Sequence, residues 1–250
     1  MRTKLIVGNW KMNGSNFLID SVNDAISSKV DKNSLEIVIC PPDVLIYYAN
    51  NLFQKSGIFV GSQNVHSEPN GAFTGETSAL LLRECGINWC IVGHSERREI
   101  FGETDDLICK KIEILIEHNI RPILCVGETK DQRESLKYEE VVVNQLRKCF
   151  SKLNSTLLNR CVVAYEPVWA IGTGKTADPE QVNVMHKIIR NELASLSNRK
   201  NSEKMQIIYG GSVNPENIKE LMSMEEIDGA LVGGASIVPD KFKEIVDLLN

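Results

Sequence analysis

A carboxylate stands just after a short apolar, largely β-branched run, Val162 to Ala164, which predicts a buried strand. Pro167 directly follows Glu166, so we expect the strand to stop with this carboxylate at its tip. The next loop mixes large apolar residues with glycines, which is typical of a flap that opens and then packs down. Glu166 is therefore a candidate general base, and the alternative is an ordinary connecting loop. The expected flap comprises Pro167, Val168, Trp169, Ala170, Ile171, Gly172, Thr173, Gly174, Lys175, Thr176 and Ala177.

The same loop contains a partial match to a nucleotide-binding motif. Gly174, Lys175 and Thr176 match the end of the pattern G-x-x-x-x-G-K-[ST], whose backbone cradles nucleotide phosphates. The motif requires its first glycine at the position that Trp169 occupies. This mismatch argues against a nucleotide hydrolase or kinase.

Polar residues and glycines also follow several other apolar runs. Taken singly, each has a common structural explanation: a solvated lysine, a histidine that caps a helix, or a glycine turn. Together they indicate a site, because the carboxyl ends of parallel strands in a barrel converge on one face. The candidates after these runs are Asn9, Lys11, His94, Glu96, Gly211, Ser212, Gly233 and Gly234.

These residue types suit proton abstraction next to a carbonyl group in a phosphorylated substrate. Glu166 would take the proton, His94 would polarise the carbonyl oxygen, and Lys11 would stabilise negative charge. The glycine turns at Ser212 and at Gly233 would offer backbone N–H groups to a phosphate. Gly172 and Gly234 would add further donors, and nothing in the pattern signals a metal or a redox cofactor.

Eight short apolar runs alternate with longer segments of helical periodicity, which predicts a closed parallel barrel. An open doubly wound sheet is less favoured, because no G-x-G-x-x-G follows the first run. We expect one domain over residues 1–250, with residues 198–204 as a surface loop. The expected strands are residues 5–7, 37–40, 58–60, 90–92, 123–126, 162–164, 207–209 and 230–232.

Composition excludes several classes of function. The chain has 250 residues, a net charge of −5 and no dense cluster of Lys and Arg, so we expect no nucleic-acid partner. No apolar run is long enough for a signal peptide core or a membrane span. The seven cysteines are spread along the chain without a C-x-x-C pair, which indicates free thiols and a cytoplasmic protein.

Six segments, GNWKMN, NGAFTGE, VGHSERR, YEPVWAIGTGKTA, YGGSV and LVGGAS, occur in the order and at the spacing found in triosephosphate isomerases. The chain resembles that family over its whole length. The resemblance implies a (β/α)8 TIM barrel that interconverts D-glyceraldehyde 3-phosphate and dihydroxyacetone phosphate through an enediolate, in glycolysis and gluconeogenesis, without a cofactor. It also implies catalytic roles for Glu166, His94, Lys11, Asn9 and Glu96, and substrate binding by Asn9, Lys11, Gly172, Ser212, Gly233 and Gly234.

The resemblance further implies a homodimer formed through the loop from Asn64 to Ser78. Thr74 would approach the partner's active site near Lys11, and Glu76 would pair with Arg97 across the interface. Two other functions remain open on the sequence: another barrel enzyme acting on a phosphorylated sugar, and a non-enzymatic homologue kept for binding.

Overall fold

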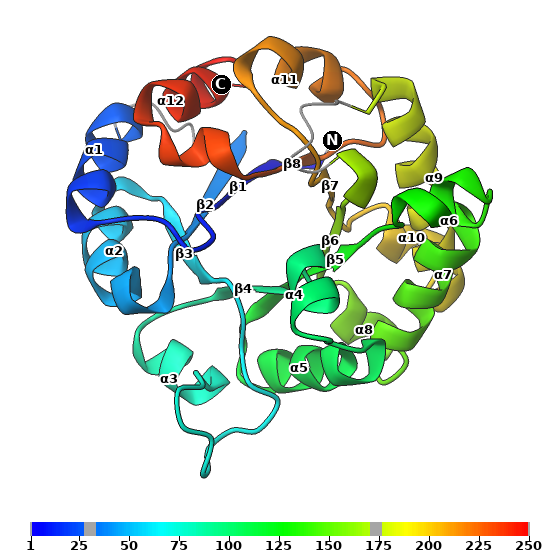
Figure 1. Cartoon of the computed structure of the whole chain (residues 1–250), viewed down its shortest axis with the longest axis horizontal. Helices are drawn as coiled ribbons and strands as arrows, with labels where there is room; N and C mark the ends of the chain where they lie inside the picture. Colours follow the sequence, from blue (N-terminus) through cyan, green and yellow to red (C-terminus); the bar gives the residue numbers. More distant parts are fainter. Residues whose placement is uncertain (1, 28–33, 171–176, 250) are drawn as a thin grey trace.

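The computed structural model describes residues 2–27, 34–170 and 177–249. Eight parallel strands pair in chain order, and β1 also pairs with β8, so the sheet closes into a barrel (Figure 1). The predicted barrel is therefore confirmed, and the open sheet is excluded. The strands are β1 (Lys4–Asn9), β2 (Leu35–Cys40), β3 (Phe59–Ser62), β4 (Trp89–Val92), β5 (Arg121–Val126), β6 (Val162–Tyr165), β7 (Ile207–Tyr209) and β8 (Gly229–Val232).

Alternation along each strand produces two apolar layers. Leu5 and Val7 belong to the cluster that fills the barrel, whereas Ile6 packs between the strands and the helices. Successive side chains of a strand point to opposite faces, and both faces of this sheet are covered. Short runs within the strands are therefore apolar on both faces, which is why runs rich in Val and Ile predicted them.

The helices form a ring outside the barrel, as Figure 1 shows. This arrangement puts the carboxyl ends of the strands and their connecting loops on one face. The α-helices are α1 (Asn16–Ile26), α2 (Asp43–Ser56), α3 (Ala79–Glu84), α4 (Ser95–Ile100), α5 (Asp105–Glu117), α6 (Lys130–Glu134), α7 (Tyr138–Cys149), α8 (Ser155–Leu158), α9 (Pro179–Leu196), α10 (Arg199–Ser202), α11 (Pro215–Met222) and α12 (Pro239–Asp247). Two 3₁₀ turns, η1 (Val168–Ala170) and η2 (Gly234–Ile237), follow β6 and β8.

Capping residues account for where helix α9 begins and for one error in the sequence prediction. The Asp178 side chain accepts the backbone N–H groups of residues 180 and 181, and Pro179 occupies the first helical position. Residues 198–204 were expected to form a loop but contain α10. Asn198 caps this helix, and the buried Arg190 donates to the Ser202 carbonyl at 2.6 Å, so tertiary contact supports a helix too short to be stable alone.

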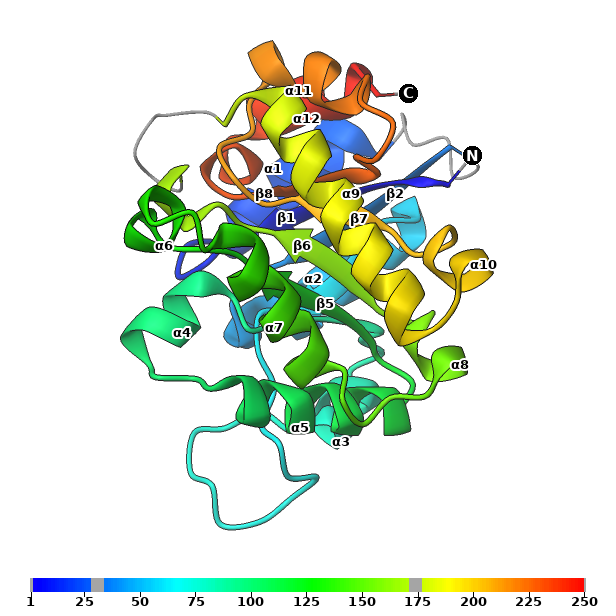
Figure 2. The same ribbon diagram turned by 90° about the vertical axis from the view of Figure 1, so that its right-hand side faces the viewer.

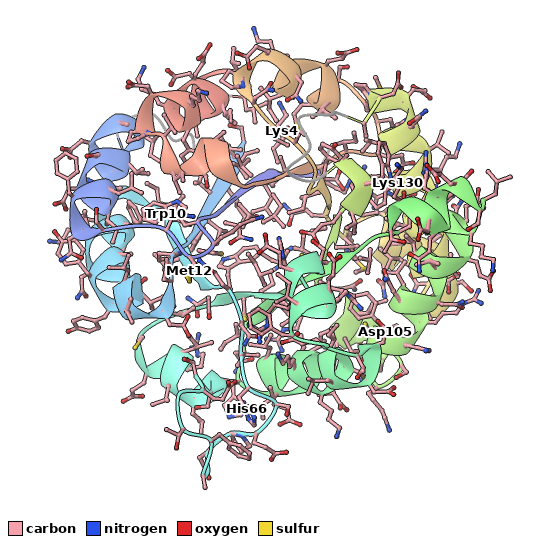
Figure 3. All side chains as sticks on the ribbon, viewed as in Figure 1. Lys4, Trp10, Met12, His66, Asp105 and Lys130 are labelled. Carbon is pink, nitrogen blue, oxygen red and sulfur yellow. The ribbon has the colours of Figure 1, made fainter. Side chains whose placement is uncertain are left out.

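The loop between β3 and α3 projects away from the barrel (Figure 2). A backbone hydrogen bond of 2.8 Å from His66 N to Thr77 O closes its base. Within the loop, the Phe73 ring lies 4.1 Å from the His66 ring between centroids, and 43% of Phe73 remains exposed. Figure 3 labels His66 at this projection. The tip of the loop therefore carries an apolar ring that the rest of the chain covers only in part.

No helix among the described residues is both long and apolar enough to cross a membrane.

Candidate active site

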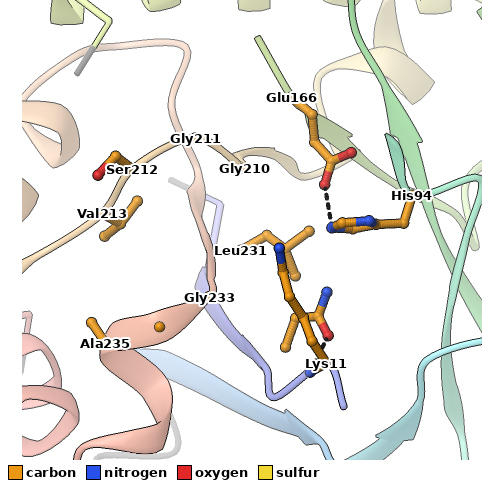
Figure 4. A pocket seen from close by; sticks show the side chains of 12 residues that line it. Lys11, His94, Glu166, Gly210, Gly211, Ser212, Val213, Leu231, Gly233 and Ala235 are labelled. Carbon is orange, nitrogen blue, oxygen red and sulfur yellow. Dashed lines mark hydrogen bonds and ion pairs between the residues drawn. The ribbon is translucent and has the colours of Figure 1, made fainter. Parts of the chain in front are cut away.

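A cavity of about 250 Å³ opens at the carboxyl ends of the strands. It brings together residues that follow β1, β4, β6, β7 and β8, as the strand-end argument predicts. Figure 4 shows the His94 ring and the Glu166 carboxylate turned toward each other, with the Lys11 side chain in the same cavity. The predicted site residues that line it are Asn9, Lys11, His94, Glu166, Gly211, Ser212, Gly233 and Gly234.

His94 is held at the amino terminus of α4, where it is the capping residue. Its Nδ1 accepts the backbone N–H of Glu96 at 3.2 Å. A nitrogen that accepts a hydrogen bond carries no proton, so a neutral His94 ring bears its proton on Nε2. Nε2 lies 3.2 Å from Glu166 Oε1 at the cavity wall. Helix α4 therefore selects the tautomer whose N–H points toward the cavity.

The Glu166 carboxylate is almost fully buried, with 1% of the residue exposed. Its Oε2 accepts the backbone N–H of Ser95 at 2.9 Å, and its main-chain N–H donates to the Val126 carbonyl at 2.8 Å. A Cβ on Gly210 would lie 2.8 Å from Glu166 Cγ, so a side chain there would crowd the carboxylate arm. The base candidate is thus fixed at its backbone, and its side chain rests on α4 while glycine leaves room beside it.

Lys11 adopts a left-handed backbone conformation, with φ at 52°. Non-glycine residues seldom occupy this region, so the neighbouring contacts must hold it there. The Asn9 side chain accepts the Lys11 N–H at 3.0 Å, and the Gln63 side chain donates to the Lys11 carbonyl at 2.8 Å. Lys11 Nζ pairs with Glu96 Oε1 at 2.5 Å. Glu96 therefore orients the lysine and, through its backbone, the histidine.

The turns after β7 and β8 provide open backbone rather than side chains. Among the described residues, a Cβ on Gly234 would meet no atom within 4 Å, and a Cβ on Gly233 would meet only the Lys11 side chain, at 3.9 Å. Crowding by this described part of the chain therefore gives no reason for glycine at these two positions. Gly234 also begins the turn η2, whose first N–H groups have no partner within the turn. An anion at this point would meet backbone donors without steric obstruction.

The sequence matches the triosephosphate isomerase family over residues 4–249. The enzyme of that name from Roseiflexus sp. (strain RS-1) is 45% identical over 250 residues, which is 100% of this chain and 98% of the relative. Triosephosphate isomerase from Clostridium tetani (strain Massachusetts / E88) is 45% identical over 249 residues, covering 99% and 97% of the two chains. The chain belongs to the triosephosphate isomerase family.

Only part of the flap expected in this chain lies within the described residues. Pro167, the turn η1 (Val168–Ala170) and Ala177 are described, and the predicted residues Ile171, Gly172, Thr173, Gly174, Lys175 and Thr176 lie outside them. Gly172, predicted as a phosphate donor, is among the latter. Trp169 Nε1 donates to Glu128 Oε1 at 2.8 Å, and the Tyr165 hydroxyl lies 3.1 Å from both Glu128 oxygens. The fully buried Glu128 thus anchors the start of the flap, a partner the sequence did not reveal.

The residues predicted for a subunit interface lie beside the site. Thr74 and Glu76 are exposed on the projecting loop, and Arg97 Nε donates to Glu103 Oε1 at 2.5 Å. Glu76, Arg97 and Lys11 line a second cavity of about 480 Å³, whereas Thr74 lines neither cavity. The pairing of Glu76 with Arg97 across an interface stays a prediction.

Within the described residues, no group of three or more His, Cys, Asp or Glu side chains is arranged to hold a metal ion.

Proposed function

We propose that this chain interconverts D-glyceraldehyde 3-phosphate and dihydroxyacetone phosphate. The observation that carries the proposal is the approach of His94 Nε2 to Glu166 Oε1, at 3.2 Å, beside unobstructed glycine turns. A buried carboxylate and a neutral imidazole that share one cavity suit proton transfer at the carbon and oxygen atoms of a carbonyl compound. Membership of the family and relatives that carry the enzyme's name over the full length support the same reaction.

In this proposal Glu166 removes a proton from the carbon next to the carbonyl group. The electron pair of that C–H bond moves into the new carbon–carbon double bond, and the carbonyl electrons move to oxygen, so an enediolate forms. His94 Nε2–H donates to the developing oxyanion, and the Lys11 cation stabilises the negative charge. Asn9 supports the Lys11 backbone at 3.0 Å, and Glu96 pairs with Lys11 Nζ. The hydroxyl proton then moves to the former carbonyl oxygen, relayed by His94 Nε2, and the electrons left on the second oxygen form the new carbonyl group. Glu166 returns its proton to the neighbouring carbon, which completes the isomerisation with no net oxidation.

Substrate binding is proposed for the turns after β7 and β8. The backbone N–H groups of Ser212, Gly233 and Gly234 donate to the phosphate oxygens, and Gly172 joins them when the flap closes. For chemistry to occur, Glu166 Oε2 must leave the Ser95 N–H, 2.9 Å away, and turn toward the substrate. A closed flap would exclude water, in which the enediolate could otherwise lose its phosphate.

The experiment is to assay the purified chain with D-glyceraldehyde 3-phosphate, following the product through a coupled reduction, beside Glu166→Gln. The amide keeps the shape of the side chain but cannot accept the carbon-bound proton, so kcat should fall roughly a hundredfold or more. Unaltered kcat in the variant would refute the assignment of the base. A folded wild-type chain that isomerises other sugar phosphates but not this one would favour a different barrel enzyme, and no turnover at all would favour a binding protein.

We also propose that the chain forms a homodimer through the face around the projecting loop. Large apolar side chains on this face are exposed: Met12 by 94%, Val44 by 91% and Phe101 by 65%. Met12, labelled in Figure 3, and Phe101 line the second cavity together with residues 75–77 of the loop. Val44 is the next residue in the sequence after Asp43, which lines the same cavity. An exposed apolar surface of this kind favours burial against a second protein surface. In the dimer, Thr74 of one copy would approach Lys11 of the other.

The oligomeric state can be tested by sedimentation equilibrium with two valine variants. Val44→Glu places a charge on the proposed interface, and Val184→Glu places one on α9, where 49% of the valine is exposed. We expect a dimer for the wild type and for Val184→Glu, and a weakened dimer for Val44→Glu. A monomeric wild type, or equal masses for both variants, would contradict the proposed interface.

We place the protein in a reducing compartment such as the cytoplasm. All seven cysteines are free thiols. Burial raises the pKa of Cys149 and Cys161 to about 12, so these thiols stay protonated and unreactive at neutral pH.

A further inference from the structure

Gln145, on helix α7, makes two hydrogen bonds to a single residue of another element. Its Oε1 accepts the Gly127 N–H at 2.8 Å, and its Nε2 donates to the Gly127 carbonyl at 3.2 Å. Both polar groups of the Gly127 backbone are therefore satisfied by one side chain. A carboxamide that pairs with a peptide in this way imitates the edge of a neighbouring strand.

The Gly127 backbone has no β4 residue to pair with, because β4 ends before this point. The last pair of the β4–β5 ladder is Val92 with Leu124. Beyond it the chain leaves the barrel to start α4, which holds His94 and Ser95. Side chains then supply the hydrogen bonds on this side of the backbone. Arg98 Nη2 donates to the Cys125 carbonyl at 3.1 Å, and Gln145 bonds to both the N–H and the carbonyl of Gly127. Gln145 thus stands where a longer β4 would have stood.

On its other side the same segment supports the backbone of Glu166. Glu166 N donates to the Val126 carbonyl at 2.8 Å, and Val168 N donates to the Glu128 carbonyl at 3.1 Å. Between these two bonds lies Gly127, packed so closely that a Cβ on it would overlap the Glu166 carbonyl oxygen. The pairing of β5 with β6 therefore continues past Tyr165 to the candidate base and the start of the flap. A shift of Gly127 would be transmitted directly to Glu166.

We infer that Gln145 is a positioning residue for the general base. It holds Gly127 from the side that β4 vacates, and Gly127 in turn fixes the Glu166 backbone opposite His94 and Ser95. This inference rests on the proposed function, since it assigns the base to Glu166. The proposed phosphate turns follow β7 and β8, whereas both hydrogen bonds of the Gln145 side chain within the described residues go to Gly127, so loss of Gln145 should disturb chemistry more than substrate binding.

The test compares Gln145→Met with Gln132→Met in steady-state kinetics. Gln132 is a matched control: it is also half-buried and lines the same cavity of about 290 Å³ beside Glu166. Its amide accepts the Thr129 N–H at 2.8 Å but makes no bond to Gly127. Since a displacement of about 1 Å can cost a hundredfold in rate, we expect Gln145→Met to lower kcat roughly 10- to 100-fold. Its KM should stay within about threefold of the wild type, and Gln132→Met should resemble the wild type.

A conservative variant separates positioning from a general loss of structure. Gln145→Glu keeps an acceptor for the Gly127 N–H and loses the donor to the Gly127 carbonyl, so its kcat should lie between those of the wild type and Gln145→Met. If Gln145→Met does not fold, the comparison of Gln145→Glu with the wild type tests the inference instead. Wild-type kcat in folded Gln145→Met, an equal loss in Gln132→Met, or a rise in KM that accounts for the whole loss would overturn the inference.

Amide hydrogen exchange gives a readout that does not depend on activity. Gln145→Met should speed exchange in the peptide containing the Glu166 N–H and leave the peptide over β7 unchanged. Unchanged exchange at Glu166 would overturn the positioning role even if the chain acts on another substrate. Faster exchange at Glu166 in a wild type that lacks isomerase activity would instead refute the proposed function and leave the positioning contact standing.

Discussion

Acidification should destabilise this fold through one buried histidine, His186 on α9. No part of its surface is exposed, and its Nδ1 lies 3.1 Å from the Glu226 carbonyl, so Nδ1 carries the proton of the neutral ring. Nε2 has no hydrogen-bond partner among the described residues, and the ring meets the Tyr165 ring edge-on, with 5.9 Å between the ring centroids. Burial lowers the pKa of His186 from 6.5 to about 3; the Glu226 carbonyl opposes this and the Arg190 charge adds to it.

The sign and size of the effect follow from proton linkage. Because the pKa is lower in the folded state, the unfolded chain binds the proton first as the pH falls. The stability contributed by the neutral ring is therefore complete above pH 6.5, declines between 6.5 and about 3, and is constant below that. Each pKa unit corresponds to about 1.4 kcal/mol, so a change from pH 7 to pH 5 should remove about 2 kcal/mol from the free energy of unfolding.

The measurement is urea unfolding of the wild type and His186→Asn at pH 7 and pH 5, at one protein concentration. Asparagine keeps an N–H for the Glu226 carbonyl and does not titrate. The variant should be less stable at pH 7 because a smaller side chain leaves a cavity. From pH 7 to pH 5, however, the free energy of unfolding of the variant should fall by about 2 kcal/mol less than that of the wild type. Equal losses in the two proteins would refute the assignment of the acid sensitivity to His186.

The remaining predictions concern one cation in the site and one in the fold. Lys11→Met removes the positive charge that faces the cavity, so it should raise KM and lower kcat/KM roughly a hundredfold or more; unchanged substrate binding in steady-state kinetics would contradict the role of Lys11. Arg190→Met leaves the carboxylates of Glu226 and Asp228 without a guanidinium that lies 2.5 and 2.8 Å from them. Its free energy of unfolding should fall by about 3–5 kcal/mol in urea titrations, and a loss below about 1 kcal/mol would show that the buried ion pairs contribute little.

Most of the barrel could be predicted because its strands obey local rules. Val162–Ala164 predicted β6, since an apolar run acts within a few residues. The cap of α9 is equally local, because Asp178 bonds to residues 180 and 181. The helix α10 was missed because its four residues depend on Arg190, a contact from another element. The run expected at residues 58–60 is displaced, and β3 covers Phe59–Ser62, because its bounds depend on pairing with β2 and β4.

The sequence was sufficient to place the candidate site residues together on one face of the fold. Glu166, His94 and Lys11 could be assigned to one cavity because each follows a strand, and the carboxyl ends of parallel strands in a closed barrel must meet. The contacts that orient these groups depend on tertiary structure. Ser95 meets Glu166 across 71 residues of sequence, and Gln145 meets Gly127 across 18. Such pairs follow from how strands end and helices pack, and no local pattern of residue types records those distances.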